Sequence, residues 1–522
     1  MADSGVRLDE LLVALSLATD LGLGQPAEHM LRATRISLRL GERLGLDGDD
    51  LAALYDVSIL TYVGCPVYGN EAATLFGDDI DFRDQTIRVD LGGVQAMTFM
   101  LRRAGAGTSP VNRARQVMGL LATGGRSVVE QMANHCSAAG ELADRLGLSP
   151  AVRAGVQQSY ARWDGKGVPA DLAGEALALP ARVAHIAEAC EVFHRCAGVD
   201  AAVAMVRART GTHFDPSVAA AVHSSAATLF AGLEENTVDE VLDAAPVGRP
   251  PLTDEELDDA LAAIGDFCDL RSPCFAGHSA GTADLAARAA DFLHVPAAEV
   301  RLLRRAALVH DVGRFGVPAT VWDKPGPLTS TERERMRMHV YYVERIFHRP
   351  VPLRRIGVLA ATHHERTDGS GYHRGIGGPM LSVPARVLAT ADGYHAMIQP
   401  RPHRGPFSPE DAACELRRDA DAGRLDPVAV DAVLSAAGHA AGRARAGGPA
   451  GLTAREADVL ALLAQGLPNK GIAQRLGISG KTVGNHVEHI YAKLCVSNRA
   501  AAAMRAMQYG LVDSTNAPAA VH

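Results

Sequence analysis

The sequence predicts an all-α protein, and three observations support this fold class. Apolar residues make up 47% of the 522 residues and aromatic residues only 5%, so the core is built mostly from Ala, Leu and Val, which suit closely packed helices. Apolar residues recur with helical spacing over long segments, while strand signals are few. Capping boxes open several of these segments, as at Thr253, Thr329 and Thr453.

Length, charge and cysteine usage limit the possible functions. The chain is long enough for three or four domains, and its net charge of −8 excludes a generally basic protein that coats nucleic acid. No apolar signal segment opens the chain, and no segment approaches the roughly 20 apolar residues of a membrane helix. The eight cysteines include no C-x-x-C pair, so we expect neither a zinc ribbon nor disulfides. A cytoplasmic protein without membrane association follows.

Histidine and aspartate gather between residues 306 and 404. The pair His310 and Asp311 is followed further along by the pair His363 and His364. A carboxylate has two oxygens, so Asp311 can bridge two metal ions. The complete candidate set contains five His and two Asp: His278, His310, Asp311, His339, His363, His364 and Asp392. This set suits Mn, Fe, Zn or Ni and exceeds the need of one metal, which predicts a two-metal phosphoester hydrolase.

These ligands, in this order, make residues 251–439 resemble the HD-GYP family of cyclic dinucleotide phosphodiesterases, a branch of the HD phosphohydrolases. The resemblance also covers His-His-Glu-Arg at 363–366, Asp-Gly-x-Gly-Tyr at 368–372 and the segment 322–329. It implies hydrolysis or sensing of a cyclic dinucleotide such as cyclic di-GMP, with two divalent transition metal ions as cofactors. Residues 251–439 are therefore expected to form an HD-GYP phosphohydrolase domain.

The resemblance also assigns roles beyond the metal ligands. The residues expected to act in catalysis are Asp311, Arg314 and Glu365. The residues expected to contact the substrate are Gly371, Tyr372, Arg401 and Arg404. Because an arginine does not readily give up a proton, we expect Arg314 to act electrostatically and not as an acid.

The chain departs from the family pattern at four places. His373 replaces the Pro that usually follows Gly-Tyr, and Arg314 replaces the Lys that usually follows His-Asp-x-Gly. Cys274 stands where some members carry a Glu for a third metal, so a third metal is not expected. Segment 401–404 has His in place of the family's Tyr but keeps both arginines.

The first half of the chain repeats the pattern of the second half but lacks most of its candidate metal ligands. His29 aligns with His278 at an offset of 249 positions, and the same offset places Tyr62 under Asp311. Beyond an insertion at about 66–117 the offset is 204, and the aligned pairs are His135 with His339, Ser159 with His363, Tyr160 with His364, and Glu188 with Asp392. We therefore expect residues 1–245 to be a degenerate HD-GYP-like domain for scaffolding, dimerisation or ligand sensing.

Two details of this organisation complete the prediction. Residues 86–91, inside the insertion, alternate well enough for one short strand. Residues 440–451 are rich in Ala, Gly and Arg and predict a linker, and residues 514–522 predict a disordered tail.

A helix-turn-helix follows the linker. Residues 469–476 predict a short helix, and Ser479 starts a longer one on which Val483, Val487 and Ile490 share an inward face. Residues 452–513 closely resemble the four-helix LuxR-type DNA-binding domain, so double-stranded DNA is an expected partner. The segment from Leu452 to Val512 holds seven Lys or Arg and three Asp or Glu, a local net charge of +4.

The residues expected to contact DNA lie on the outward side of these helices. Those expected at phosphates are Lys470, Lys481, Thr482 and Lys493. Those expected at base edges are Gly484, Asn485 and Glu488. The whole chain is thus expected to be two tandem HD-type domains followed by a LuxR-type domain, acting as a homodimeric transcription regulator with a phosphodiesterase. The alternatives are a catalytically inactive nucleotide sensor that binds DNA, and a phosphohydrolase of another phosphoester.

Overall fold

The computed structural model describes residues 5–90, 92–439, 452–494, 496, 499, 502, 503 and 506. The chain divides into two compact units, Met1–Gly438 and His439–His522. Within the described residues both units are helical, and β structure is limited to isolated bridges. The all-α prediction is therefore confirmed.

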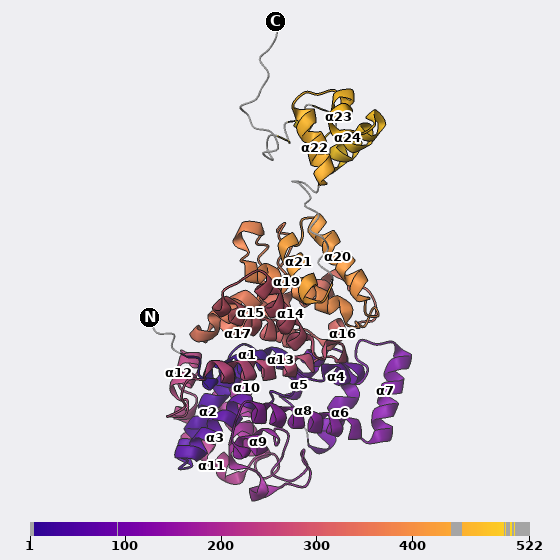
Figure 1. Ribbon diagram of the computed structural model, residues 1–522. Coiled ribbons are helices and arrows are strands. Elements are labelled where there is room, and N and C mark those ends of the chain that lie inside the picture. The colour runs from indigo at the N-terminus through magenta and orange to yellow at the C-terminus, as the bar shows by residue number, and fades with distance from the viewer. Residues whose placement is uncertain are drawn as a thin grey trace. The chain divides into compact units, whose positions relative to one another are not determined.

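The first unit contains most of the helices (Figure 1). Its first half comprises α1 Leu8–Leu23, α2 His29–Arg43, α3 Gly48–Leu60, α4 Gly69–Phe76, α5 Asp79–Thr86, α6 Gly93–Arg103, α7 Pro110–Thr123, α8 Arg126–Arg145, α9 Pro150–Val156, the 3-10 turn η1 Gly174–Ala176, α10 Leu179–Arg209, α11 Pro216–Leu229 and α12 Thr237–Asp243. Its second half comprises α13 Asp254–Asp269, η2 Pro273–Phe275, α14 His278–Phe292, α15 Ala297–Val309, η3 Val312–Gly316, α16 Ala319–Trp322, α17 Ser330–His348, η4 Val351–Leu353, α18 Arg354–Ala360, η5 Gly378–Met380, α19 Val383–Ile398, α20 Pro409–Asp421 and α21 Pro427–Ala436.

Side-chain caps define where the helices around the site begin. At α13 the Glu256 N–H donates to Thr253 Oγ1 at 3.2 Å, and the Thr253 N–H donates back to the Glu256 carboxylate at 2.8 Å. Thr329 and Glu332 make the same reciprocal pair at the start of α17. The capping boxes read from the sequence are therefore formed, and the second one opens the helix that carries His339.

The helices of the first half recur in the second half at the offsets seen in the sequence. The pairs with equivalent first residues are α2 with α14, α3 with α15, α8 with α17, α9 with α18, and α10 with α19. Individual contacts recur too: Asp20 accepts from the Met30 N–H at 3.0 Å, and Asp269 accepts from the Ser279 N–H at 2.9 Å. The two halves therefore share helix order and local contacts.

Two glycines show how close this correspondence is. A Cβ on Gly64 would lie 2.1 Å from the His135 carbonyl oxygen, and a Cβ on Gly313 would lie 2.0 Å from the His339 carbonyl oxygen. Only a residue without a side chain allows the backbone to approach this closely. In the second half this contact brings the turn after Asp311 against the helix that carries His339.

One hydrophobic core runs through both halves of the first unit. Helix α1 of the first half packs on η3 and α17 of the second, and α13 of the second half packs on α8 of the first. In the internal repeat α13 aligns with α1 and α17 aligns with α8. Each half therefore packs its own first helix on the other half's α8 or α17. Leu12 and Leu15 share this core with Ile264 and Phe267, and all four are buried. The two halves therefore form one compact unit, with the second half above the first in Figure 1.

The insertion is helical, and the predicted strand is wrong for the residues that are described. Thr86 ends α5, and residues 87–90 form a turn and bend; Leu91 lies outside the described residues. The Asp78 carboxylate caps α5 by accepting from the backbone N–H groups of Ile80 and Asp81, both at 3.1 Å. This cap favours a helix, and the described chain offers no neighbouring strand to pair with.

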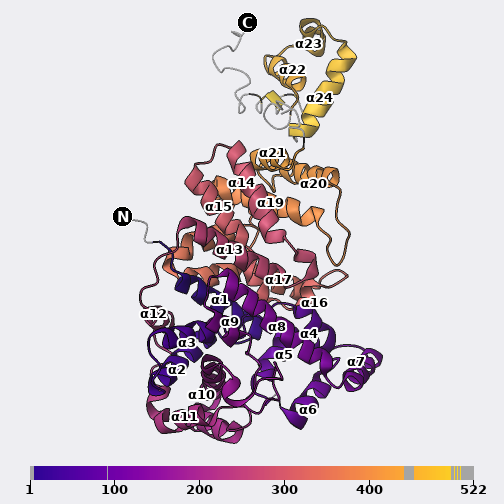
Figure 2. The same cartoon turned by 60° about the horizontal axis from the view of Figure 1, so that its bottom comes forward.

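Helices α4 to α7 have a small core of their own. The Phe76 and Phe82 rings stack at 3.9 Å, and Met100, Leu120 and Val128 complete the cluster. Figures 1 and 2 both show α6 and α7 at one edge of the unit. The insertion is thus an ordered helical layer.

The second unit contains α22 Ala454–Ala464, α23 Asn469–Leu476 and α24 Gly480–Leu494. Val483, Ile490 and Leu494 are buried in its core, and Val487 packs against it, as the helical spacing predicted. The predicted linker 440–451 and tail 514–522 lie outside the described residues, as does most of the predicted fourth helix.

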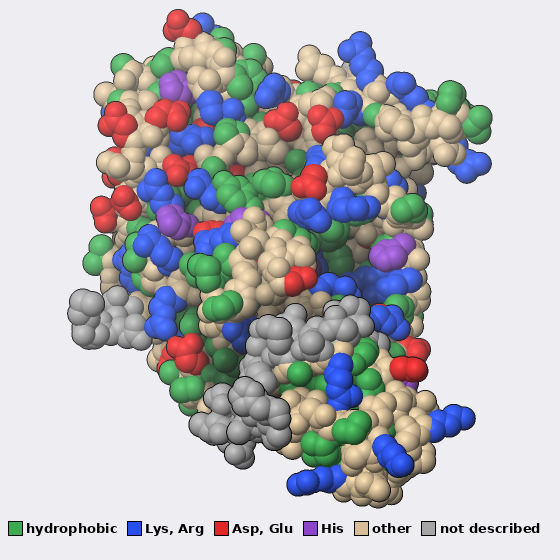
Figure 3. Space-filling model, turned by 90° about the horizontal axis from the view of Figure 1, so that it is seen from above, with side chains coloured by type: hydrophobic (Ala, Val, Ile, Leu, Met, Phe, Trp, Pro, Cys, Tyr) green, Lys and Arg blue, Asp and Glu red, His purple; other side chains and the backbone are tan. Residues whose placement is uncertain are grey.

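The charged side chains on the surface and the character of the helices can be compared with the expectation of a protein without membrane association. Figure 3 shows Lys and Arg side chains intermingled with Asp and Glu on the face in view. Among the described helices, none combines the length and the apolar character needed to cross a bilayer.

Candidate active site

Five segments bring the seven candidate ligands together in the second half. His278 starts α14, and His310 and Asp311 lie where α15 passes into η3. His339 lies in α17, the His363–His364 pair follows α18, and Asp392 lies in α19. All seven side chains are buried except that of His364, which is half-buried.

The carboxylate of Asp311 lies between two groups of imidazoles. Its Oδ1 atom is 3.6 Å from His339 Nε2 and 3.7 Å from His363 Nε2. Its Oδ2 atom is 3.0 Å from His310 Nε2 and 3.5 Å from His278 Nε2. Each oxygen therefore faces a different pair of nitrogen ligands, as a bridging carboxylate does.

Asp392 spans the same two groups from another side. Its Oδ1 atom lies 3.1 Å from His278 Nε2 and 3.7 Å from His310 Nε2, and its Oδ2 atom lies 3.9 Å from His364 Nδ1. The side chains that could together hold a metal ion form two groups: His278, His310 and Asp311; and His339, His363 and His364. The number and kinds of ligand fit transition metal ions.

Backbone hydrogen bonds orient three of the imidazoles. The Nδ1–H groups of His310 and His363 donate to the carbonyl three residues earlier, at 2.7 and 2.8 Å, and His339 makes the same contact. A proton on Nδ1 leaves the Nε2 lone pair free and directed towards Asp311. Hydrogen bonds of this kind fix the tautomer of histidines that bind metals.

The electrostatics of the group suit a cation. Burial lowers the pKa of His278 and His339 to about 4 and that of His363 to about 3, so these rings are neutral near pH 7. Burial opposes charge on His310 as well, but the carboxylates of Asp311 and Asp392 raise its pKa to about 10. Neither oxygen of the buried Asp311 accepts a hydrogen bond. The two carboxylates thus stabilise a positive charge at this position, which a bound metal ion would supply in place of the proton on His310, and the neutral imidazoles offer nitrogen lone pairs to such an ion.

Of the two residues predicted to assist Asp311, only Arg314 touches it. The Arg314 guanidinium is in ion-pair contact with Asp311 Oδ2 and lies 3.8 Å from the centre of the Phe275 ring. Glu365 is buried and accepts from the backbone N–H groups of Arg374 and Ile376, at 2.8 and 3.0 Å. Its carboxylate therefore holds the loop after the Gly-Tyr motif.

Gly371 and Tyr372 form one wall beside the ligands. The Tyr372 ring stacks on His364 with centroids 4.8 Å apart. A Cβ on Gly371 would lie 2.4 Å from the Arg366 backbone nitrogen, so the loop folds this tightly only with glycine.

The two predicted phosphate-binding arginines differ in their surroundings. Arg401 donates to the Cys274 carbonyl at 3.0 Å and lies over the Phe275 ring at 5.1 Å; burial, together with the charge of Arg314, lowers its pKa to about 10. The Arg404 guanidinium instead donates to carbonyls at the end of α19, including that of Ala396 at 2.8 Å. Arg401 is therefore part of the site's surroundings, and Arg404 caps a helix.

Sequence reasoning missed two residues behind His278. Its Nδ1 atom lies 3.0 Å from Gln399 Oε1 and 3.2 Å from His395 Nδ1. Both residues follow Asp392 at helical spacing, three and seven positions later, which is the signal that could have found them. The amide oxygen of Gln399 accepts the Nδ1 proton and turns Nε2 towards the carboxylates.

Replacing Gln399 by Leu is expected to weaken metal binding by about 10- to 100-fold, because His278 loses the acceptor that fixes its tautomer. The Gln399→Glu variant keeps an acceptor oxygen at the same place and should bind metal at least as tightly as the wild-type chain. Metal affinity is measured by titration of the metal-stripped protein. Equal affinities for the two variants would contradict the role given to Gln399.

The second unit presents its predicted DNA-contacting residues to solvent. Lys470, Lys481, Thr482, Asn485 and Glu488 are exposed, and Gly484 is half-buried. The Lys493 side chain lies outside what is described. The Thr482 N–H donates to Ser479 Oγ at 3.1 Å, which defines the start of α24. The exposed start of this helix is the part that enters a groove in helix-turn-helix proteins.

Fold and site together define an HD-domain phosphohydrolase joined to a bacterial regulatory domain. Residues 263–428 match the HD domain, and residues 450–506 match the luxR family of bacterial regulatory proteins. The 3'3'-cGAMP-specific phosphodiesterase 3 of Vibrio cholerae is 31% identical over 437 residues, which cover 82% of this chain and 94% of that protein. The chain therefore belongs to the HD-GYP family of cyclic dinucleotide phosphodiesterases and carries a LuxR-type DNA-binding domain in addition.

Two further comparisons agree. The cyclic di-GMP phosphodiesterase of Thermotoga maritima is 36% identical over 29% of this chain and 41% of its own length. The crystal structure of a cyclic GMP-AMP-specific phosphodiesterase of V. cholerae superposes with a TM-score of 0.58 at 27% identity, covering 83% of this chain and 98% of that one. The two matches to V. cholerae proteins are longer than the HD domain at residues 263–428, so they include the first half as well.

Proposed function

We propose that this protein is a transcription regulator whose second HD-type domain hydrolyses a cyclic dinucleotide. The observation that carries the proposal is the carboxylate of Asp311, each oxygen of which faces two imidazole nitrogens. A pure nucleotide sensor needs no such arrangement. For this reason we favour hydrolysis over sensing, which remains the alternative, as does hydrolysis of another phosphoester.

Two divalent ions of Fe, Mn, Zn or Ni would be held by the seven ligands, with Asp311 and Asp392 shared between the two groups. Such ions supply a nucleophile from water at neutral pH and neutralise charge on phosphoryl oxygens. The protein contributes neutral, oriented imidazoles and the negative charge of two carboxylates, which together would retain the ions. Arg314 balances part of that charge from beneath Asp311.

The substrate would lie between the ligands, Tyr372 and Arg401. Arg401 stays protonated near pH 7 because its pKa of about 10 lies well above that pH, so it can attract a phosphate. The Tyr372 ring, already stacked on His364, offers an apolar surface near the reacting group. The long match to a 3'3'-cGAMP-specific phosphodiesterase makes 3'3'-cGAMP, beside cyclic di-GMP, the first substrate to test.

Hydrolysis is tested with the full chain and a panel containing 3'3'-cGAMP, cyclic di-GMP, cyclic di-AMP and a linear phosphodiester. We expect turnover of at least one cyclic dinucleotide that stops on removal of metal and returns when metal is added. Binding without turnover in a metal-loaded protein would favour the sensor. Turnover of the linear diester alone would favour a different phosphoester.

We further propose that the chain acts as a homodimer on double-stranded DNA and that nucleotide and DNA influence each other's binding. If the nucleotide changes the affinity of the protein for DNA by some factor, thermodynamic linkage requires that DNA changes the affinity for the nucleotide by the same factor, typically 5- to 150-fold. The affinity of a phosphorothioate analogue of the substrate, measured with and without a selected DNA site, gives this factor. Identical affinities would mean that the two activities only share a chain.

A further inference from the structure

The first half contains a cavity where the second half has its metal ligands. The cavity has a volume of about 270 Å³, and its lining includes Tyr62, Ser159, Tyr160 and Glu188. These residues occupy the positions of Asp311, His363, His364 and Asp392 in the internal repeat. Small-molecule sites are concave and mostly apolar with a few polar groups. The place of the lost centre is thus available to another ligand.

This cavity lacks a metal centre. Among the described residues, the side-chain groups that could hold a metal ion lie in the second half. His29 is engaged by Glu191, with Nδ1 and Oε2 2.6 Å apart, and the position of the bridging carboxylate is taken by Tyr62. Its ligand must therefore be recognised by other means.

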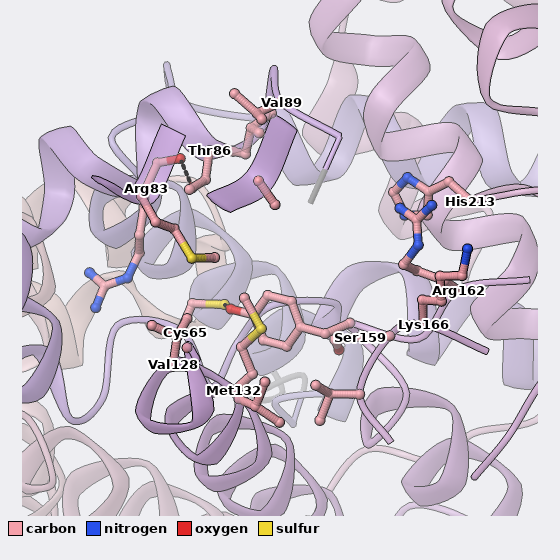
Figure 4. A pocket seen from close by; sticks show the side chains of 18 of the residues that line it. Cys65, Arg83, Thr86, Val89, Val128, Met132, Ser159, Arg162, Lys166 and His213 are labelled. Carbon is pink, nitrogen blue, oxygen red and sulfur yellow. Dashed lines mark hydrogen bonds between the residues drawn. The ribbon is translucent and has the colours of Figure 1, made fainter. Parts of the chain in front are cut away.

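One end of the cavity is apolar. Met97 and Met100 of α6 line it together with Val128 and Met132 of α8, and the Cys65 thiol lies 2.8 Å from the Tyr160 hydroxyl oxygen in its wall. Figure 4 shows Cys65, Val128 and Met132 gathered on one side. Flexible methionine side chains adapt to apolar molecules of different shape. Since α6 belongs to the insertion, the insertion closes the cavity.

The other end is cationic. Figure 4 shows Arg162, Lys166 and His213 on this side. Arg162 already has carboxylate partners in Asp90 and Asp164. Lys166 is largely exposed, and the buried Nδ1 atom of His213 has no hydrogen-bond partner.

Arg209 is the cation that lacks a counter-ion. It lines the cavity and is only 9% exposed, and its guanidinium donates to the Arg88 carbonyl at 3.1 Å. Among the described residues, no carboxylate lies within ion-pair distance of it. Burial lowers the pKa of Arg209, so an anion placed beside it would relieve an unfavourable charge. The carboxylates of Asp90 and Glu188 act on Arg209 from further away: Asp90 pairs with Arg162, and Glu188 Oε1 lies 3.7 Å from His29 Nε2 without a hydrogen bond.

We propose that this cavity binds a small carboxylic acid with an apolar body, whose carboxylate pairs with Arg209 and whose body lies among the methionines. A volume of about 270 Å³ is at the lower end for ligand sites, which span roughly 300–1,000 Å³. A cyclic dinucleotide, with two bases and two phosphates, is too large and too polar for it. The site is therefore separate from that of the substrate, and it can bind its ligand whether or not the second half is catalytic.

Helix α5 connects the cavity to the catalytic half. Arg83 and Thr86 of α5 line the cavity, while Asp79 of the same helix pairs with the fully buried Arg271 at 2.7 Å. Asp79 also accepts from the Ala319 backbone N–H at 2.8 Å, just beyond η3, which follows Asp311. A ligand that presses on α5 thus reaches the segment that positions Asp311, and we expect it to change the hydrolysis rate.

Binding is tested by calorimetric titration of the full chain with octanoate, 4-phenylbutyrate and octanamide. We expect at least one of the two acids to bind saturably and octanoate to bind at least about tenfold more tightly than octanamide, because only an acid pairs with Arg209. Arg209→Met should abolish the preference for acid over amide. Arg207→Met, on the same helix and exposed, should leave it unchanged.

Three results would overturn the proposal: failure of both acids to bind the wild-type chain, equal binding of octanoate and octanamide by that chain, or an unchanged preference for octanoate in Arg209→Met. The comparison of octanoate with octanamide uses the wild-type chain, so it decides the matter even if Arg209→Met does not fold. Equal binding of acid and amide there would remove the assigned role of Arg209. Because this test measures ligand binding and not turnover, it is independent of the proposed hydrolase activity.

Discussion

Replacing Asp311 by Asn is expected to remove both metal ions and to lower hydrolysis by more than about 100-fold. Loss of a residue that only supports a metal ligand typically lowers metal affinity or activity by about 10- to 100-fold. We expect a larger loss at Asp311, because its carboxylate lies between the two ligand groups. The amide keeps the size of the side chain, but it carries no charge, and it presents an NH₂ donor where a second ligand oxygen is needed. Elemental analysis of the purified variant and its rate with the active dinucleotide measure the two effects.

The matched control is Asp284→Asn. Asp284 lies in the same half, but its side chain is 70% exposed and pairs with Arg288 along the helix. Metal content and rate should both stay at wild-type values in this variant. Two ions retained in Asp311→Asn would place the metal centre elsewhere and contradict the proposed mechanism.

Removing residues 439–522 is expected to abolish specific DNA binding while the hydrolysis rate stays within about twofold of the full chain. The two units have separate hydrophobic cores, and all seven candidate metal ligands lie in Met1–Gly438. The segment from Leu452 to Val512 also has a local net charge of +4 within a chain of net charge −8, so the remainder is negative and repels DNA. Gel-shift titration at two salt concentrations, together with the hydrolysis assay, tests both statements.

A single-residue variant tests one expected phosphate contact of the second unit. Lys481→Ala should weaken binding to all sequences alike and reduce the salt dependence by about one unit of slope, because it removes one phosphate contact. Arg418→Ala, which removes an exposed cation from the first unit, should leave the slope unchanged. DNA binding by the truncated chain with an undiminished slope would move the DNA site into the first unit.

Much of the candidate site could be predicted because several of its residues are adjacent in the sequence. His310 and Asp311 are adjacent, as are His363 and His364, and adjacency with suitable donor atoms predicts ligands before any fold is known. The helices were predictable for the same reason, since caps such as Thr329 with Glu332 act within four residues. The helix-turn-helix is equally local, and its inward face formed as its spacing predicted.

The partners of buried side chains were not predictable, because they come from distant segments. Gln399 supports His278 across more than a hundred positions, and Glu365, expected to assist catalysis, holds a loop. Arg404 has the residue type that the family pattern requires, but its guanidinium donates to carbonyls at the end of the preceding helix α19. Residues 86–90 show the limit at short range: a weak apolar alternation predicted a strand, but α5 extends to Thr86 and is followed by a turn in which the Val89 N–H donates to the Thr86 carbonyl at 2.9 Å.

The sequence alone thus determined the helical class, the order of the segments, the internal repeat and the set of candidate metal ligands. Tertiary structure decided which carboxylate oxygen faces which imidazoles, that both halves share one core, and that residues of the insertion line a cavity in the first half. The physical reason is the range of the interactions. Capping, helical periodicity and ligand chemistry act within a few residues, whereas burial and the pairing of charges such as Asp79 with Arg271 depend on segments that only folding brings together.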